Sequence, residues 1–358
     1  EKLKFIKVAE DWEAESIEFS PKQWADYFKT TRPSSTAIKI ISVSNMLDEI
    51  IERKRTRKRL INNFEVTSKG SAKYYATLKR HLGEFTTSAY NKALSTYYFT
   101  DLNSQFVEDF LFFLKKKAKE NNAPSVPRAY LTVLYGLVYY AHEKKLPGSD
   151  LSIFATTKNQ IQKNETEPQT ISIEVMKKIE NLDRSLLTKN ECEYLDYYLF
   201  CFYAGGMPPI NASYLEWTNI DEKCILRYNR FKTGKKAEVP FIKKAFDIAE
   251  KYSSKCFNHF VLPIYSHKQI SEDQKIMKLK RVSIHVNRTL TKVAELIGYD
   301  GKITWYSARG TFITYMVKKG YNAFDIAKMC GNSVMAIERS YFKQTDHKNI
   351  LDEMNASF

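Results

Sequence analysis

The amino-acid sequence predicts a mainly helical protein of two domains, with a small β-hairpin in the second domain. The chain has 358 residues, which is more than one ordinary domain needs. Its first half repeats apolar residues at helical spacing, and a strand-like pair separated by a turn lies in the second half. Residues 155–170 lie between the halves, hold Ile161 as their one large apolar residue and contain a proline near their end, a composition typical of a linker.

Residues 40–154 are predicted to form a bundle of four or five helices. The apolar residues that recur at helical spacing are Val43, Met46, Leu47, Ile50, Tyr74, Leu78, Leu82, Phe85, Phe106, Phe110, Phe113, Tyr130, Val133, Leu134, Leu137 and Ala141. Residues 1–39 precede them and mix charge with scattered aromatic residues. This N-terminal segment is too short to bury a core of its own, and we assign it no role.

The bundle carries two clusters of cationic side chains. The first comprises Arg53, Lys54, Arg55, Arg57, Lys58 and Arg59, and the second comprises Lys115, Lys116, Lys117, Lys119 and Arg128. A single cationic run is usually a solvated face, but two runs on one helical module favour contact with nucleic-acid phosphates. The whole chain has 56 Lys and Arg against 41 Asp and Glu, a formal charge of +15, which also favours a polyanionic partner. The plainer interpretation is that a basic balance only aids solubility or weak nonspecific binding.

The composition disfavours several other classes of function. No stretch approaches the roughly 18 apolar residues that a membrane span needs, so we expect no membrane partner. The five cysteines are odd in number and form no C-x-x-C pair, which argues against a zinc module or a disulfide framework. The sequence has no P-loop, no dinucleotide fingerprint and no metal-ligand spacing among its six histidines, so we predict neither cofactor nor metal. It shows no recognisable leader, so a cytoplasmic protein is the default expectation.

Residues 171–358 are predicted to form a second domain that is also mostly helical. A helix begins near Ile173, and an aromatic-rich helix follows at about 194–203. Two short strands at 224–228 and 237–241 flank a turn at Thr233-Gly234. The remainder is predicted to be helical, with stops at Gly298, Gly320 and Gly331.

Three short motifs near the C-terminus hold chemically informative residues in a fixed order. They are residues 303–312 (ITWYSARGTF), 330–333 (CGNS) and 338–342 (ERSYF). This order resembles the tyrosine recombinase family, also called the phage integrase family, and is most similar to integrases of Bacteroides-type mobile elements. In that family a His-x-x-Arg box precedes a helix, a Leu-Gly-His turn follows, and the nucleophilic tyrosine comes ten residues after the glycine of that turn. Here Arg309 falls on the box arginine, and Gly331 and Tyr341 have the same separation.

Two elements upstream extend the resemblance to residues 170–358. Residues 202–207 (FYAGGM), followed by residues 215–221, are similar to the first active-site box of the family. Residues 230–234 (RFKTG) are similar to its β-hairpin, whose lysine would be Lys232. The helical module before them matches the core-DNA-binding domain in position, and the resemblance implies the DNA breaking-rejoining fold for residues 171–358.

The resemblance implies a site-specific recombinase that cleaves and rejoins double-stranded DNA. The reaction would pass through a 3′-phosphotyrosine intermediate and a Holliday junction. The partners would be DNA, three further copies in a homo-tetramer on paired sites, and in some reactions an accessory DNA-bending protein. A tail helix around residues 350–354 would dock on a neighbouring protomer, the two domains would clamp the duplex from opposite faces, and the protein would be associated with the nucleoid.

The residue types suit phosphoryl transfer for reasons that do not depend on the resemblance. A phosphodiester attacked by a side-chain oxygen passes through a crowded anionic transition state, which preorganised cations stabilise. Arg309 offers a fixed fork of donors to two nonbridging oxygens. Tyr341 would be the nucleophile, and Lys232 could protonate the leaving 5′-oxygen. A phosphotyrosine link conserves the bond energy, so rejoining would need neither ATP nor metal.

The second and third motifs depart from the family pattern. Tyr306 and Asn332 stand where histidines are usual, and Gly310 follows the box arginine where histidine is common. Each has a second interpretation. Tyr306 could be a packed aromatic residue, and Asn332 or Ser333 could cap the helix that carries the tyrosine.

The first box departs further from the pattern. It has Gly206-Met207 where an arginine is usual and Asn211 where a carboxylate is usual. Our hypothesis is that Arg230, or alternatively Arg227, supplies the missing charge from the adjacent strand. The assignment of Lys232 also has a second interpretation, because Lys232-Thr233-Gly234 could be an ordinary hairpin turn without a catalytic role.

Three alternatives to a recombinase stay open at the level of sequence. A type IB topoisomerase-like enzyme would use the same tyrosine chemistry on arbitrary DNA. A catalytically inactive relative would bind DNA and never form an adduct, which the missing arginine and the two absent histidines make plausible. A helical regulator or scaffold outside the family would leave the order of the motifs unexplained.

Overall fold

The computed structural model describes residues 20, 22–23, 41–61, 64–67, 69–161 and 168–342. Within this part the protein is mainly helical and contains two small two-stranded sheets, so the predicted fold class is confirmed. None of the described helices is long and apolar enough to cross a membrane. The predicted N-terminal segment, apart from residues 20 and 22–23, and the predicted tail helix lie outside the described residues.

The chain folds into two compact units. Unit 1 comprises residues 1–58 and 67–164, and unit 2 comprises residues 59–66 and 165–358. Each unit has its own hydrophobic core.

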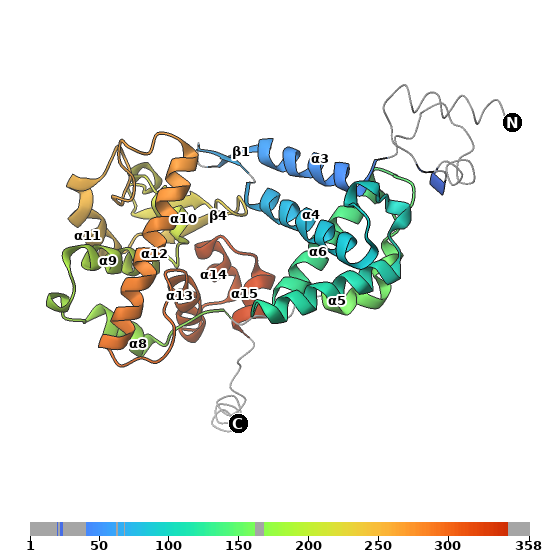
Figure 1. Ribbon diagram of the computed structural model, residues 1–358. Helices are drawn as coiled ribbons and strands as arrows, with labels where there is room; N and C mark the ends of the chain where they lie inside the picture. The colour runs from blue at the N-terminus through green and yellow to red at the C-terminus, as the bar shows by residue number, and fades with distance from the viewer. Residues whose placement is uncertain are drawn as a thin grey trace, which may run out of the picture. The chain divides into compact units, whose positions relative to one another are not determined.

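Unit 1 is a bundle of helices (Figure 1). Its core is formed largely by the apolar residues predicted from helical spacing, but Tyr74 is 54% exposed and lies outside that core. The described elements of unit 1 are α3 (Val43–Thr56), α4 (Lys69–Tyr90), η1 (Leu94–Thr96), η2 (Phe99–Asp101), α5 (Ser104–Glu120), α6 (Val126–Glu143), η3 (Leu151–Thr157) and α7 (Lys158–Ile161). Side-chain caps fix two of the helix starts. Ser42 Oγ accepts from the backbone N–H of Asn45 at 3.1 Å, and Asn103 Oδ1 accepts from that of Phe106 at 2.9 Å.

Unit 1 continues beyond residue 154, where the sequence analysis placed the start of a linker. The polar stretch after residue 154 begins with the end of η3 and all of α7, and the unit ends at residue 164. Thr157 is buried, and Ile161 packs against the core of unit 1. The one large apolar residue of the stretch therefore belongs to packed structure, which composition alone does not reveal.

A hairpin of β1 (Lys58–Ile61) and β2 (Phe64–Thr67) interrupts the helices between α3 and α4. Its residues 59–66 belong to unit 2, although the helices on either side belong to unit 1. The sequence analysis placed this stretch, and with it Arg59, inside the helical bundle, and that placement is corrected here. Four-residue strands are too short to display a reliable period of two, so contacts with distant residues decide their structure.

Unit 2 is built around the buried helix α9. Its described elements outside the first hairpin are α8 (Ile173–Glu180), η4 (Arg184–Leu186), α9 (Lys189–Tyr203), α10 (Pro209–Ser213), η5 (Trp217–Asn219), β3 (Ile225–Asn229), β4 (Lys236–Pro240), α11 (Lys243–Tyr252), η6 (Ser253–Lys255), α12 (Glu272–Leu296), α13 (Ser307–Lys318), α14 (Ala323–Cys330) and α15 (Val334–Tyr341). Trp305, just before α13, donates from Nε1 to the carbonyl of Tyr197 at 3.3 Å and stacks on its ring. This contact ties the second motif to the centre of the core.

Strands β3 and β4 form the predicted antiparallel pair, with Tyr228 opposite Ala237. The predicted strand bounds are correct to within one residue. The short helices α13, α14 and α15 pack against one another at the C-terminal end of the described chain (Figure 1). Gly331 ends α14 with a left-handed φ of +61°, as predicted for a helix stop.

Candidate active site

Arg309 lies in the first turn of α13 with only 3% of its surface exposed. Its Nη1 donates to the carbonyl of Gly206 at 3.0 Å, and its Nη2 donates to the carbonyl of Cys330 at 2.8 Å. Gly206 has a φ of +64°, and a Cβ there would stand 3.0 Å from the Arg309 Cα. The glycine of the first box therefore permits close approach of the backbone to the box arginine.

Arg230 comes directly after β3 and is also buried, with 6% of its surface exposed. In β3 the side chains of Leu226 and Tyr228 are buried, and the alternation of a strand continues to Arg230. Its Nη1 donates to the carbonyl of Gly331 at 3.1 Å and to Asn332 Oδ1 at 2.8 Å. Its Nε is buried and has no hydrogen-bond partner.

The two arginines are held by consecutive residues of one turn. Cys330 accepts from Arg309, whereas Gly331 and Asn332 accept from Arg230. Within the described chain, no ion pair joins either guanidinium to a carboxylate. Burial lowers the pKa of Arg230, and the charge of Arg309 lowers it further. Two neighbouring buried cations without a counter-charge form an arrangement that favours an anion.

Tyr341 is the last residue of α15 and packs beside the small core formed by α13, α14 and α15. Burial raises the pKa of its phenol to about 12, while the positive charges of Arg309 and Arg230 act in the opposite direction. The phenol therefore lies within electrostatic range of both arginines and is protonated at neutral pH. The turn at Gly331 and the eight residues of α15 account structurally for the ten-residue separation seen in the sequence.

The structure also places the two residues that stand in for histidines. Tyr306 is 54% exposed at the start of α13, and its charge influences the pKa values of both Tyr341 and Arg230. This exposure disfavours the interpretation of Tyr306 as a packed aromatic residue. Asn332 accepts from Arg230, and Ser333, the N-cap residue of α15, makes no side-chain capping bond. The capping interpretation of these two residues is not what the structure shows.

Lys232 is exposed on the loop between β3 and β4, and its side chain makes no hydrogen bond or ion pair with another site residue in the described chain. Arg227, one of the two proposed substitutes for the missing arginine, is on the opposite side of β3 from Arg230. It pairs with Asp221 and, at 3.5 Å, with Glu238. Its charge is thus already balanced, unlike that of Arg230.

Asn211 and Gly310 have structural explanations. Asn211 is buried, and its Nδ2 donates to the carbonyl of Asn229 at 3.0 Å, which holds the end of β3 next to Arg230. A Cβ on Gly310 would stand 2.4 Å from the carbonyl oxygen of Gln169. The chain entering unit 2 therefore occupies the space of the side chain that is common at this position in the family.

The cationic clusters of unit 1 are only partly free. Arg53 stacks over Tyr140, Lys54 lies 5.1 Å from the ring of Tyr75, and Lys117 is paired with Glu84. The residues that are at least partly exposed and form no ion pair within the described chain are Arg55, Arg57, Lys115, Lys116, Lys119 and Arg128.

Sequence analysis missed a cationic stripe on α12. This helix has 25 residues, and Lys280, Arg281 and Arg288 are exposed on it without an ion pair in the described chain. Positions 281 and 288 are seven residues apart and therefore lie on one helical face. That spacing was a usable signal, but the residues form no continuous run of charge.

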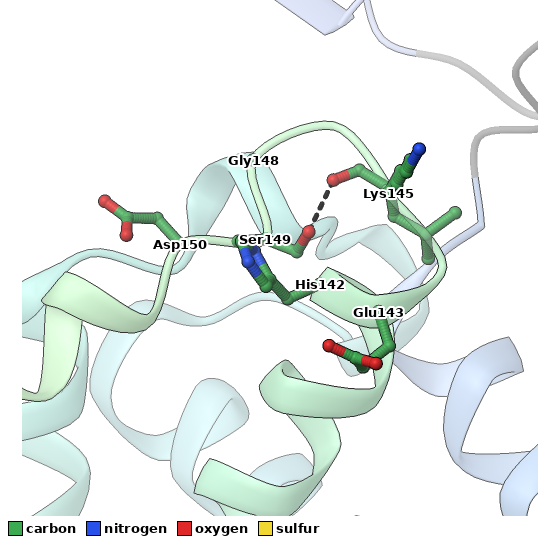
Figure 2. Close-up of a pocket in the computed structure, with 7 residues that line it drawn as sticks. His142, Glu143, Lys145, Gly148, Ser149 and Asp150 are labelled. Carbon is green, nitrogen blue, oxygen red and sulfur yellow. Dashed lines mark hydrogen bonds between the residues drawn. The ribbon is translucent and has the colours of Figure 1, made fainter.

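A separate hollow of about 570 Å³ lies in unit 1 between the end of α6 and η3 (Figure 2). His142 Nδ1 lies 2.8 Å from the carbonyl of Ser149, and Ser149 Oγ donates to the carbonyl of Leu146 at 2.5 Å. The polar groups of His142 and Ser149 are thus used by the turn itself. Among the described residues no group of three or more His, Cys, Asp or Glu side chains could hold a metal ion.

Comparisons with known proteins give a consistent result. The model of the phage integrase family matches residues 172–348, and the model of the phage integrase SAM-like domain matches residues 42–151. No curated protein matches the chain. A lambda integrase dimer bound to a COC′ core site has 12% identity and a TM-score of 0.57, covering 84% of this chain and 96% of that one. The Tn1549 transposon integrase in complex with transposon right end DNA has 11% identity and a TM-score of 0.57, covering 88% and 99%.

At this level of identity the solved structures establish the fold, which is that of DNA integrases. A SAM-like helical unit followed by an integrase catalytic unit defines the class of site-specific DNA recombinases. The chain belongs to the phage integrase family, the tyrosine recombinases.

Proposed function

We propose that this recombinase cleaves and rejoins duplex DNA through a 3′-phosphotyrosine bond to Tyr341. The observation that carries the proposal is the pair of buried guanidiniums, Arg309 and Arg230, fixed by one turn and near the phenol. Among the residues that the structure describes, no carboxylate pairs with either guanidinium, and in this proposal the scissile phosphate supplies the negative charge.

In the proposed reaction Tyr341 Oη attacks the scissile phosphorus, and the bond from phosphorus to the 5′-oxygen breaks. The phenol proton passes to solvent or a base, and the ammonium of Lys232 gives a proton to the departing 5′-oxygen. Arg309 and Arg230 stabilise the negative charge of the nonbridging oxygens. Rejoining reverses each step, with a 5′-hydroxyl attacking the phosphotyrosine.

Arg230 takes the role of the arginine that is missing from the first box, and Arg227 does not. Asn332 orients Arg230 by accepting from its Nη1 at 2.8 Å. The exposure of Tyr306 and its electrostatic effect on Arg230 support a contact between Tyr306 and the phosphate in this proposal. This assignment favours an active enzyme over a catalytically inactive relative.

Around the site we propose a DNA surface and an assembly. The proposed DNA surface comprises the first cluster, Arg53, Lys54, Arg55, Arg57, Lys58 and Arg59, and the second cluster, Lys115, Lys116, Lys117, Lys119 and Arg128. All of these residues belong to unit 1 except Arg59, which belongs to unit 2. A lambda integrase tetramer bound to a Holliday junction shares the fold, with 10% identity and a TM-score of 0.54. By analogy we propose a homo-tetramer on paired sites that exchanges strands through a Holliday junction, with an accessory DNA-bending protein where the sites require one. The protein would then act at the nucleoid.

The deciding experiment is covalent trapping. The protein and a Tyr341→Phe variant are incubated with nicked duplexes made from DNA that flanks the gene, and denaturation-resistant protein–DNA adducts are detected. We expect an adduct with the unaltered chain and none with the variant. DNA binding without any adduct would instead support an inactive relative, and relaxation of supercoiled DNA without a specific site would support a topoisomerase-like enzyme.

A further inference from the structure

Phe64, in the hairpin between α3 and α4, inserts its ring into an aromatic cluster of unit 2. Its ring centroid is 4.9 Å from that of Tyr214 and 6.3 Å from those of Phe231 and Phe260. The Nζ of Lys275 lies 5.5 Å from the Phe64 centroid and 5.6 Å from the Tyr214 centroid. Aromatic and cation–π contacts of this kind fix the orientation of a ring as well as its burial.

The same cluster holds the loop that carries two proposed site residues. Phe231 is the residue between Arg230 and Lys232, it is 94% buried, and its centroid is 4.7 Å from that of Tyr214. Three backbone hydrogen bonds also close the loop. Arg230 N–H donates to the carbonyl of Lys235 at 2.9 Å, and the N–H groups of Thr233 and Gly234 donate to the carbonyl of Arg230 at 3.2 and 2.7 Å. The packing of Phe231 in the cluster therefore helps to fix the positions of its two neighbours, Arg230 and Lys232.

We infer that Phe64 is a positioning residue for DNA cleavage. Its ring forms one wall of the pocket that seats Phe231, and it thereby fixes Lys232 relative to the buried Arg230. The inference rests on the proposed function, in which Lys232 protonates the leaving 5′-oxygen. Because the hairpin continues directly from the cationic end of α3, one short segment of chain joins the proposed DNA contacts at Arg55 and Arg57 to the loop of the general acid.

The chemistry of the leaving group separates positioning of Lys232 from general loss of structure. An alkoxide is a poor leaving group unless it receives a proton. When sulfur replaces the bridging 5′-oxygen, the leaving thiolate has a conjugate acid with a pKa of roughly 8.5, so it departs without a proton donor. The cleavage rate of a variant that has lost only the general acid is therefore restored on the sulfur duplex. The cleavage rate of a variant with a damaged phosphate site stays low on both duplexes.

The experiment uses the full chain and a duplex that carries the mapped cleavage position, made once with oxygen and once with sulfur at the bridging 5′ position. The variants are Phe64→Ala, Phe64→Leu and Lys232→Ala, with Leu60→Ala as the matched control. Leu60 is on the same hairpin and is 74% exposed. Single-turnover cleavage rates and DNA dissociation constants are measured for each protein on both duplexes.

We expect Lys232→Ala to slow cleavage of the oxygen duplex by about 10²- to 10⁴-fold, the usual contribution of a general acid. Phe64→Ala should slow it by about 10- to 100-fold through misplacement of the acid. Both defects should largely disappear on the sulfur duplex. Phe64→Leu, which keeps an apolar side chain of similar reach, should recover much of the oxygen rate, and Leu60→Ala should match the unaltered chain on both duplexes.

One result would overturn the inference and leave the proposed function intact. In that result, Phe64→Ala slows cleavage of the oxygen and sulfur duplexes equally, while the cleavage rate of Lys232→Ala is restored on the sulfur duplex. If Phe64→Ala does not fold, Phe64→Leu carries the same comparison with a smaller effect. If the unaltered chain cleaves neither duplex, or if Lys232→Ala is not rescued, the proposed chemistry itself fails and the inference fails with it.

Discussion

At the scale of single residues, we propose that Arg230 supplies, from another backbone position, the charge that the first box lacks. The first box has no arginine at Gly206-Met207, and Met207 is fully buried in the core. Arg230 reaches the same turn as Arg309 from the end of β3. The burial pattern of β3 distinguishes Arg230 from Arg227. The two residues are three positions apart, and side chains an odd number of positions apart point to opposite faces of a strand.

We predict that Arg230→Ala lowers the cleavage rate by about 10²- to 10³-fold, the usual cost of removing one preorganised donor to an anionic transition state. Arg227→Ala is the matched control, since Arg227 is occupied by Asp221 and Glu238. Covalent adduct formation on the same duplex provides the measurement. Equal losses in the two variants would show that Arg230 has no special part in the reaction.

The pH dependence of cleavage follows from the state of Tyr341. Burial raises the pKa of its phenol to about 12, so the phenolate fraction grows about tenfold with each pH unit below that value. Tyr306 and Asn332 stand where the family has two histidines, so the proposed site contains no imidazole at these positions. We expect the single-turnover rate to rise continuously between pH 6 and 9. A plateau or bell centred near pH 6.5 would reveal a histidine-like group that we have not assigned.

At the scale of elements, the entry of the chain into unit 2 is fixed against α13. Gln169 Oε1 accepts from Thr304 Oγ1 at 3.0 Å, and the N–H of Ile171 donates to Thr311 Oγ1 at 3.1 Å. Gly310 lies next to these two hydrogen bonds, and a Cβ on it would point at the carbonyl of Gln169. The helix that carries Arg309 is thus held by the segment that precedes α8.

Gly310→Ala should destabilise the protein by about 1–3 kcal/mol, because the new Cβ would stand 2.4 Å from a backbone oxygen and force the segment away. Gly83→Ala in α4 is the control. No atom lies within 4 Å of a Cβ built there, and alanine favours a helix, so that variant should gain up to about 1 kcal/mol. Urea denaturation of both variants measures the difference. A Gly310→Ala protein as stable as the unaltered chain would contradict the close packing.

At the scale of the whole molecule, the formal charge of +15 makes DNA binding dependent on salt. Each lysine or arginine that neutralises a phosphate adds about 0.9 to the slope of log K against log salt concentration. Arg55 and Arg57 are exposed and form no ion pair in the described chain, whereas Lys117 is paired with Glu84.

We predict that Arg55→Ala combined with Arg57→Ala lowers that slope by about 2, in keeping with two lost phosphate contacts. Lys117→Ala should lower it by less, because its charge is already balanced by Glu84. Fluorescence anisotropy with a labelled duplex at several salt concentrations gives the slopes. An unchanged slope in the double variant would remove the end of α3 from the DNA surface.

The sequence by itself determined the helical character of both units, the β3–β4 hairpin and the order of Arg309, Gly331 and Tyr341. These features depend on local periodicity, on turn residues and on separation along the chain, all of which are visible in one dimension. Only the tertiary structure decided that Arg230 rather than Arg227 shares the turn at Gly331 with Arg309, that residues 59–66 belong to unit 2, and that Gly310 makes room for the incoming chain. The reason is physical: Arg230 meets Asn332 across 102 residues of sequence, and no local pattern records a contact at that distance.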